Sequence, residues 1–326
     1  MGSPMKSPLH SGHPGHPGHP GALFRTLRPW LIERFGRPVH RVALDAGSTC
    51  PNRDGTKGTG GCTYCDVEGS GTGALRSGID LARQLDEGIA RVSRRDPGGG
   101  VIAYFQSYSN TYVDEGRLDE VLSVVETRLG DPVVCVSVAT RPDTLPDRAL
   151  ERLARLARRV PVWVELGLET ADDRILLDVN RLHTVDDFRD AVQRAHAAGL
   201  EVVGHAILGL PGDGRAGARH TAEVLAETAV EGVKVHHAMV LRKTQLASLW
   251  RSGGFEPLDV AAYVSWLADF VERLEPEQVL HRLTGDSPPE ELLAPRWDVH
   301  KNRVRELLAK ELARRGTRQG AAFMAS

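Results

Sequence analysis

The sequence predicts an α/β fold built on a parallel sheet, and two observations carry this prediction. Short β-branched runs alternate with amphipathic stretches from residue 39 to residue 240, and several runs are apolar on successive residues, as in Val133-Val134-Cys135-Val136. Such runs are typical of strands that are buried on both faces. Repeated strand–helix units imply right-handed crossovers, which produce either an open doubly wound sheet or a partial barrel. In both arrangements, functional side chains lie at the C-terminal ends of the strands.

Six strands are expected. They are residues 39–44, 101–105, 133–138, 162–168, 202–208 and 233–240. One helix is clearly marked, because Thr184 is a capping residue with an acid, Asp187, three positions on, and Gly199 ends the pattern. Similar helical patterns cover residues 118–129, 148–158 and 221–231. Beyond residue 245 the pattern changes to helices at 259–274 and 299–315, with a short run at 279–283 between them.

The chain divides into three segments of different composition. Residues 1–22 contain three His-Pro-Gly units and nothing to bury, so we expect a disordered tail. Residues 23–244 hold the alternating strands and helices, and residues 245–326 form a C-terminal extension that is mostly helical. The net charge of −2 does not attract nucleic acid to the molecule as a whole. Eight basic and three acidic residues follow position 295, so this end carries +5 and the rest carries −7.

The sequence gives no sign of a membrane or secreted protein. No apolar run reaches the length of a bilayer-spanning helix, and the N-terminus lacks the charged and apolar regions of a signal peptide. We therefore expect a cytoplasmic protein that has no membrane partner. The cytoplasm keeps thiols reduced, so clustered cysteines are expected to bind metal or to do chemistry rather than to form disulfides.

Three of the four cysteines, Cys50, Cys62 and Cys65, follow the first expected strand with the spacing C-x11-C-x2-C. The loop between them is rich in glycine and polar residues, so it can fold around an inorganic core. Three thiolates on a [4Fe–4S] cluster leave one iron open, and S-adenosylmethionine can chelate that iron through its amino and carboxylate groups. An electron from the cluster then cleaves the sulfonium to give a 5′-deoxyadenosyl radical. The aromatic ring of Tyr64 is suited to lie against this cofactor.

A structural zinc site is the alternative interpretation of the three cysteines. It requires a fourth ligand. Cys135 lies within an apolar run and is expected in the core, but a histidine could complete the set. Counting residues therefore leaves both kinds of site open.

Several motifs resemble those of the bacterial YhcC/YtqA-type radical SAM proteins. They are the segment 44–55, Cys62-Thr63-Tyr64-Cys65, Ala103-Tyr104-Phe105-Gln106, Thr140-Arg141-Pro142-Asp143, the segments 165–170 and 205–212, Asn180-Arg181 with His183-Thr184, the segment 281–286 and Ala294-Pro295-Arg296-Trp297. The resemblance extends from about residue 24 to residue 320. Some of the same motifs are similar to the radical SAM domain of the Elongator catalytic subunit. The resemblance implies a partial (β/α)6 TIM-type radical SAM barrel with a small C-terminal extension.

The resemblance also implies roles for individual residues. Cys50, Cys62 and Cys65 would be the metal-binding and catalytic residues. Glu169 would accept hydrogen bonds from the ribose hydroxyls of S-adenosylmethionine, and Arg181 would pair with its methionine carboxylate. The remaining expected cofactor contacts are His205 near the ribose, Ile207 and Gly209 near the adenine, and Gln106, Ser107 and Asn110 near the methionine amine.

Each of three polar contacts also has a structural interpretation. Glu169 could stabilise the N-terminus of the next helix, Arg181 could form a surface ion pair, and His205 could be a satisfied buried histidine. Their shared position at or just beyond strand ends, beside a cysteine triad, favours the functional interpretation.

Three functions are compatible with these features. The Elongator resemblance favours modification of tRNA at carbon 5 of a wobble uridine, with the base splayed out of its stack. A small metabolite is the second candidate substrate, because a fold does not fix its substrate. A metal-stabilised binding module without turnover is the third. A radical SAM enzyme would also require an electron donor such as flavodoxin or ferredoxin.

The basic C-terminal helix is the candidate surface for tRNA. Its apolar positions should dock on the barrel, and they are Val304, Leu307, Leu308 and Leu312. Its basic positions would then largely point outward, and they are Lys301, Arg303, Arg305, Arg314 and Arg315. These charges could bind phosphates or could form an ordinary solvated surface.

Overall fold

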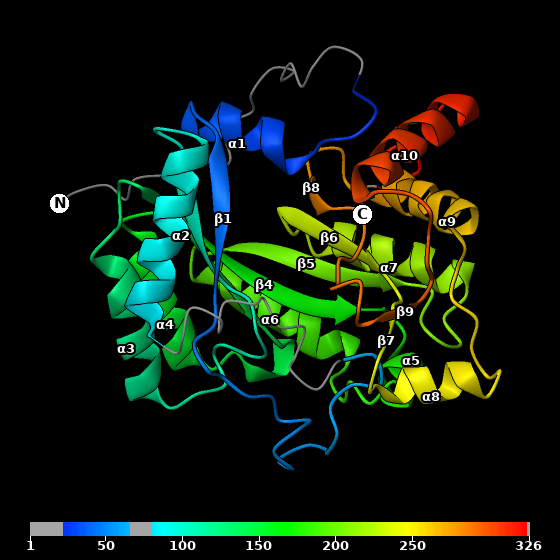
Figure 1. The fold of residues 1–326 in the computed structure, drawn as a ribbon, viewed down its shortest axis with the longest axis horizontal. Helices are drawn as coiled ribbons and strands as arrows, with labels where there is room; N and C mark the ends of the chain where they lie inside the picture. The colour runs from blue at the N-terminus through cyan, green and yellow to red at the C-terminus, as the bar shows by residue number, and fades with distance from the viewer. Residues whose placement is uncertain (1–21, 66–79, 325–326) are drawn as a thin grey trace.

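The computed structural model describes residues 22–65 and 80–324, and its centre is a curled sheet of seven parallel strands. The strand order is β1-β2-β3-β4-β5-β6-β8, so β1 and β8 are the two edges of an open, partial barrel (Figure 1). The strands are β1 (Val39–Leu44), β2 (Gly100–Phe105), β3 (Val133–Thr140), β4 (Val162–Glu169), β5 (Glu201–Leu208), β6 (Gly232–His237) and β8 (Val279–Arg282). The predicted α/β barrel is confirmed. The predicted tail at residues 1–22 lies, except for its last residue, outside the described ranges.

Helices cover the outer face of the sheet and bury the main apolar cluster against it. They are α2 (Leu81–Arg95), α3 (Glu115–Glu126), α4 (Asp147–Ala157), α6 (Val185–Ala197) and α7 (Arg215–Glu227). The predicted cap of α6 is present, because Thr184 and Asp187 form a reciprocal capping box. Helix α7 begins six residues before its predicted start. The first turn of α7 was not predicted because it contains Gly217, and glycine is a weak helix former. Glycine is needed there, since a Cβ at that position would lie 1.8 Å from the Asp213 carboxylate.

The inner face of the sheet forms a second apolar cluster at the amino ends of the strands. Cys135 and Trp163 belong to it, and helix α1 (Leu27–Phe35) packs on it through Leu31. Cys135 is fully buried there, as the sequence predicts. Arg34 of α1 forms an ion pair with Glu201 at 2.5 Å, and Glu201 also accepts a hydrogen bond from the Trp163 indole at 2.8 Å. Helix α1 therefore closes one end of the barrel and leaves the other end for access.

The C-terminal segment adds helices and also completes the sheet. It contains α8 (Gln245–Arg251), α9 (Val260–Arg273), α10 (Lys301–Arg315) and a small antiparallel pair, β7 (Val240–Leu241) with β9 (Leu292–Ala294). The predicted sixth strand, 233–240, is divided into β6 and β7. The short run at 279–283 is largely β8, which pairs in parallel with β6 as a seventh strand. Within the described ranges, no helix combines the length and the apolar character that a bilayer-spanning segment requires.

Helix α10 differs from its prediction in one respect. Val304, Leu308 and Leu312 are buried as expected. Arg315, however, points inward and contacts Asp269 at 2.7 Å, Glu272 at 3.2 Å and Glu311 at 2.7 Å. The prediction that Arg315 points outward is therefore wrong, because three carboxylates gather where α10 meets α9.

Helix α10 also lies far from the cysteine loop. It is beside α9 at one end of the molecule, whereas α5 (Asp173–Asp178), α8 and the loop after β1 lie at the other end (Figure 1). The charges of Arg303 and Arg314 are partly offset by Glu306 and Glu311, which pair with them at 2.5 Å and 2.8 Å. The side chain of Lys301 is outside the described part of the chain.

Asp269 is expected to stabilise the fold, because this buried carboxylate accepts hydrogen bonds from three guanidinium groups on α7 and α10. These belong to Arg215, Arg219 and Arg315. Burial alone would raise the pKa of Asp269, but the three guanidinium groups hold it below its ordinary value of 3.8. Asp269→Asn should lower the free energy of unfolding by about 2 kcal/mol at pH 7, as measured by denaturant titration.

The stabilisation that Asp269 contributes should depend on pH. A depressed carboxyl pKa stabilises the fold above the unfolded value, near 3.8, and this contribution is lost as the pH falls further. The difference between wild type and Asp269→Asn should therefore shrink below about pH 4. Asp86→Asn is a matched control, because Asp86 pairs with Arg128 on the exposed surface. Equal losses for the two variants would contradict the assignment.

Candidate active site

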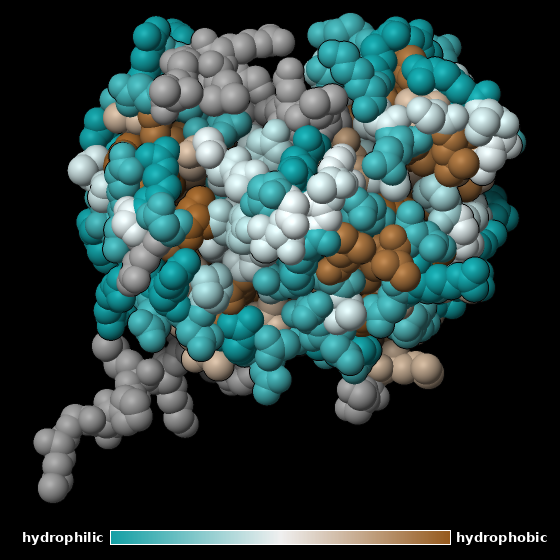
Figure 2. All heavy atoms as spheres, turned by 90° about the horizontal axis from the view of Figure 1, so that it is seen from below, coloured by the Kyte–Doolittle hydropathy of each residue, from teal (hydrophilic) through white to brown (hydrophobic). Residues whose placement is uncertain are grey.

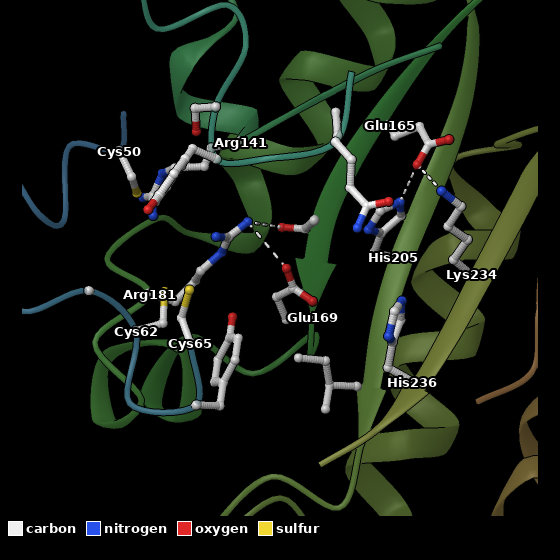
Figure 3. A pocket seen from close by; sticks show the side chains of 18 of the residues that line it. Cys50, Cys62, Cys65, Arg141, Glu165, Glu169, Arg181, His205, Lys234 and His236 are labelled. Atoms are coloured by element: carbon white, nitrogen blue, oxygen red, sulfur yellow. Dashed lines mark hydrogen bonds and ion pairs between the residues drawn. The ribbon is translucent and has the colours of Figure 1, made fainter. Parts of the chain in front are cut away.

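The three predicted cysteines line a single cavity at the open end of the barrel (Figure 3). Cys50 and Cys62 are buried, and Cys65 is partly exposed. The loop that carries them follows β1 and has little regular structure, so side chains hold it in place. The Asn52 amide donates to the carbonyl of Arg181 at 2.9 Å, and the Asn180 amide donates to the carbonyl of Gly61 at 2.7 Å. The segment after α5 therefore fixes the cysteine loop.

The arrangement of the thiols bears on the kind of metal site. Within residues 22–65 and 80–324, no three His, Cys, Asp or Glu side chains are grouped as ligands of a single metal ion. Three thiols that share a cavity without meeting at one point suit a polynuclear cluster, in which each thiolate binds a different iron. A zinc site, the alternative that the sequence left open, would need a fourth ligand beside the three thiols. Arg53 adds a donor to the Cys65 sulfur at 3.3 Å.

Glu169 and Arg181 form a buried ion pair beside the thiols. Their side chains are only 12% and 11% exposed, and the pair distance is 3.3 Å. Arg181 also donates to the carbonyl of Gly167 at 3.1 Å. The interpretation of Arg181 as a surface ion pair is therefore excluded, because the guanidinium lies inside the cavity between the cysteines and Glu169 (Figure 3).

The backbone at the end of β4 turns the Glu169 side chain into the cavity. The pairing register shifts between Gly167 and Glu169, and Glu169 adopts a left-handed conformation with φ of 69°. Gly167 is required for steric reasons, since a Cβ there would lie 2.2 Å from Glu169 Oε1 and 2.5 Å from Arg181 Nη2. The left-handed backbone conformation of Glu169 is strained. Backbone strain of this kind persists where the surrounding structure enforces it, and it is concentrated at functional sites.

Unsatisfied polar atoms show that the cavity fits a polar molecule. Four buried atoms on its wall have no hydrogen-bond partner in the described part of the chain. They are Tyr64 Oη, Ser109 Oγ, Arg141 Nη1 and Arg181 Nε. Buried polar groups are normally hydrogen-bonded, so a cluster of such atoms beside three thiols is suited to a ligand with carboxylate, amine and hydroxyl groups. Tyr64 and Ile207 supply an apolar patch to the same wall.

Nine of the twelve predicted site residues line the cavity. They are Cys50, Cys62, Tyr64, Cys65, Gln106, Glu169, Arg181, His205 and Ile207.

The other three predicted residues are not on the cavity wall. The Asn110 amide donates to the backbone carbonyls of Phe105, Ser107 and Ala139, so Ser107 and Asn110 fix the loop after β2. Gly209 has φ of 80° and lies against Leu258, where a Cβ would be 2.9 Å from the leucine side chain. The Asn110 amide and Gly209 thus have contacts within the fold, whereas the buried Ser107 hydroxyl has no hydrogen-bond partner in the described part of the chain.

The sequence analysis missed a charged network deeper in the barrel. Glu165 is fully buried; its carboxylate accepts hydrogen bonds from Ser137 at 2.6 Å and His205 at 2.8 Å, and it is also in contact with the Lys234 ammonium. Lys234 in turn donates to the Tyr104 hydroxyl at 3.0 Å. His205 is thus a satisfied histidine that also lines the cavity. A Glu and a Lys within apolar strands were the available signal, because a charged residue in a strand that is buried on both faces needs a polar partner.

The protonation states of this network follow from burial. Burial acts to raise the pKa of Glu165, but Lys234 and His205 hold it well below its usual range, so the carboxylate stays ionised. Burial lowers the pKa of His205 despite its bond to Glu165. Burial and then the charge of Arg282 lower the pKa of His236 well below its ordinary value. Both imidazoles are therefore neutral near pH 7.

The fold and the site agree with comparisons to known proteins. Residues 50–225 match the model of the radical SAM superfamily, and residues 230–314 match the model of the radical SAM C-terminal domain. The chain therefore belongs to the radical SAM superfamily. Proteins of this superfamily use a [4Fe–4S] cluster and S-adenosylmethionine, and the cavity has the thiols and the unsatisfied polar atoms to hold both.

The close relatives are proteins of the YtqA/YhcC type. The chain is 39% identical to YtqA of Bacillus subtilis over 300 residues, which is 92% of each chain. It is 34% identical to YhcC of Escherichia coli over 268 residues, or 82% of this chain and 85% of that one.

Weaker similarity extends to larger proteins. A tRNA uridine(34) acetyltransferase of Methanocaldococcus jannaschii is 26% identical over 208 residues, 63% of this chain and 37% of that protein. The solved structure of the archaeal Methanocaldococcus infernus Elp3 has the same fold, with a TM-score of 0.67 at 18% identity; the match covers 86% of this chain and 64% of that one.

Iron binding should depend on the three cavity thiols and not on the fourth cysteine. Anaerobically reconstituted protein is expected to bind about four irons per chain, as the three-thiolate site implies. Changing Cys50, Cys62 or Cys65 to Ala should remove this iron, as measured by iron analysis and visible absorption. Cys135→Ala is the matched control, because Cys135 is buried in the inner apolar cluster. Tight binding of one zinc, with no uptake of iron, would contradict the cluster assignment.

Proposed function

We propose that this chain is a tRNA-modifying radical SAM enzyme that acts on carbon 5 of a wobble uridine. The observation that carries the radical SAM chemistry is the shared cavity of three thiols and the buried Glu169–Arg181 pair. The observation that favours tRNA is the sequence similarity to a tRNA uridine(34) acetyltransferase over 63% of the chain.

Each residue of the cavity has a proposed task. Cys50, Cys62 and Cys65 hold the cluster. When bound, the cluster and S-adenosylmethionine supply a 5′-deoxyadenosyl radical. Arg181 binds the methionine carboxylate through a charge-assisted hydrogen bond, and Glu169 accepts from the ribose hydroxyls.

The remaining wall residues have tasks that follow from their chemistry. Tyr64 and Ile207 form the apolar wall beside the adenine, while Gln106 and His205 offer polar contacts. The reductant is a small electron carrier of the flavodoxin or ferredoxin type.

The face around the cavity is suited to a polar partner. Hydrophilic residues prevail on this face, and hydrophobic ones occur in small separate patches (Figure 2). Leu241 lines the cavity, and the exposed Arg242 and Lys243 follow it directly at the rim. A uridine must leave its stack to enter the barrel, so phosphates next to it would lie near this rim. These two cations are better placed for tRNA than helix α10, which lies at the opposite end of the molecule.

Arg181 can be tested for its part in binding S-adenosylmethionine. Arg181→Gln should weaken this binding about tenfold or more, because a hydrogen bond to a charged group contributes about 1.5–3 kcal/mol. Iron content should be unchanged, since the Arg181 group that holds the cysteine loop is its backbone carbonyl. Equilibrium dialysis with labelled S-adenosylmethionine on cluster-loaded protein measures the effect. Arg174→Gln is the control, as Arg174 is exposed on α5; equal affinity of both variants would show that the carboxylate binds elsewhere.

The tRNA surface can be located by comparing two pairs of charges. Reversing Arg242 and Lys243 to Glu should weaken tRNA binding by about tenfold at low salt and flatten its salt dependence. Reversing Arg303 and Arg305 on α10 should have a much smaller effect. Filter binding over a salt series measures both. A larger effect from the α10 pair would restore that helix as the RNA surface, and wild-type protein that fails to retain tRNA at low salt would favour a small-molecule substrate.

A further inference from the structure

The deep end of the cavity, beyond Glu169 and Arg181, carries an excess of positive charge. Lys234 and Arg282 line it, and Glu165 is the carboxylate that lines the same part. Arg41 adds a third cation behind the wall; its guanidinium lies 5.7 Å from the centre of the Tyr104 ring. Lys234 is paired with Glu165, so Arg282 and Arg41 are the cations of this region that no carboxylate of the described chain balances.

The basic side chains form a row across neighbouring strands. In the pairing register, His205 of β5 is opposite Lys234 of β6, and Lys234 is opposite Arg282 at the end of β8. His236 lies two residues beyond Lys234 on the same strand and lines the same cavity, with its ring 6.0 Å from that of His205. The row thus leads from the cofactor residues of β4 to the edge strand of the sheet.

Glu165 cannot neutralise this row further. One carboxylate oxygen accepts from Ser137, and the other is shared by His205 and Lys234. Arg282 makes no hydrogen bond or ion pair with any residue of the described chain, although its charge lowers the pKa of Tyr104, Lys234 and His236. Arg282 is half-buried where it lines the cavity, so its guanidinium is open to an anion that enters there.

We propose that Arg282, with Lys234 and His236 beside it, is a subsite for an oxyanion on the substrate, a carboxylate or phosphate group. The guanidinium offers two parallel N–H donors to such a group, and the neutral His236 offers one more. This subsite rests on the proposed function, because it requires the substrate to enter the cavity that holds the cofactor. It deepens that function by adding an anionic group of the substrate that reaches the barrel floor and is distinct from the neutral uracil ring and from the phosphates at the rim.

Anion binding can be measured without turnover. We choose trifluoroacetate as a carboxylate probe, followed by fluorine NMR, with oxidised, cluster-loaded protein and saturating S-adenosylmethionine so that Arg181 is already occupied. Wild-type protein should broaden the probe signal. Arg282→Gln should weaken binding at least about tenfold, since a charge-assisted hydrogen-bonded contact is lost, and Arg282→Lys should recover part of it. Arg305→Gln, on the exposed face of α10, is the control and should bind as the wild type does.

Competition identifies the anion. Displacement of the probe by acetate but not by inorganic phosphate would assign a carboxylate, and displacement by phosphate would assign a phosphate group. Displacement by neither, or equal binding by wild type and Arg282→Gln, would overturn the subsite. Cleavage of S-adenosylmethionine is measured separately, after reduction of the same preparations with dithionite. If wild-type protein does not cleave S-adenosylmethionine, the proposed enzyme activity is refuted. If it cleaves S-adenosylmethionine but does not bind the anion, only the subsite is refuted.

Discussion

The geometry of the site depends on an exchange of hydrogen bonds between two asparagine side chains and two backbone segments. Asn52, in the cysteine loop, donates to the carbonyls of Asn180 and Arg181. Asn180 donates back to the carbonyls of Thr59 and Gly61. A loop without strand or helix pairing needs such partners for its buried polar groups. As a consequence, the three thiols and the Glu169–Arg181 pair form one unit, and neither can shift without breaking these bonds.

The barrel interior changes in chemical character along its axis. Trp163, Leu31 and their neighbours close the amino end with apolar side chains. The charged network around Glu165 and Lys234 follows, and the thiols lie at the open end (Figure 3). Because charges interact more strongly in a water-poor interior, the closed end strengthens every polar contact above it. The plug formed by α1 is therefore part of the site's electrostatics, although none of its residues lines the cavity.

The sequence predicted the repeating architecture well, because burial on both faces leaves a visible apolar pattern in each strand. The six strands, the cap at Thr184 and the core position of Cys135 were all predicted in this way. The charged residues inside the barrel were missed because the prediction relied on this apolar pattern alone. An apolar strand with one Glu or Lys gives no sign of whether that residue faces the barrel interior, and the partners Glu165 and Lys234 are 69 positions apart.

Long-range packing explains the other differences. Helical periodicity identified the buried face of α10, but it could not show that Arg315 would meet Asp269 across 46 positions. Four residues of β8 were too few to be recognised as a strand. The loop residues Ser107 and Asn110 were expected near the methionine amine by resemblance; neither lines the cavity, and the Asn110 amide donates to three backbone carbonyls.

The part of the chain from residue 230 onward has a larger part in the site than an appended domain would have. The thiols, Glu169, Arg181 and His205 all lie between residues 50 and 225, the range that matches the superfamily model. Lys234, His236 and Arg282 lie between residues 230 and 314, the range of the C-terminal model. Because β8 pairs with β6, the second range supplies Lys234 and Arg282 to the deep wall of the cavity beside Glu165 of the first range, and it also supplies Leu241 at the rim. If Arg282 binds the substrate, cofactor chemistry and substrate selection are encoded in separate parts of the chain, and the substrate could change without disturbing the thiols.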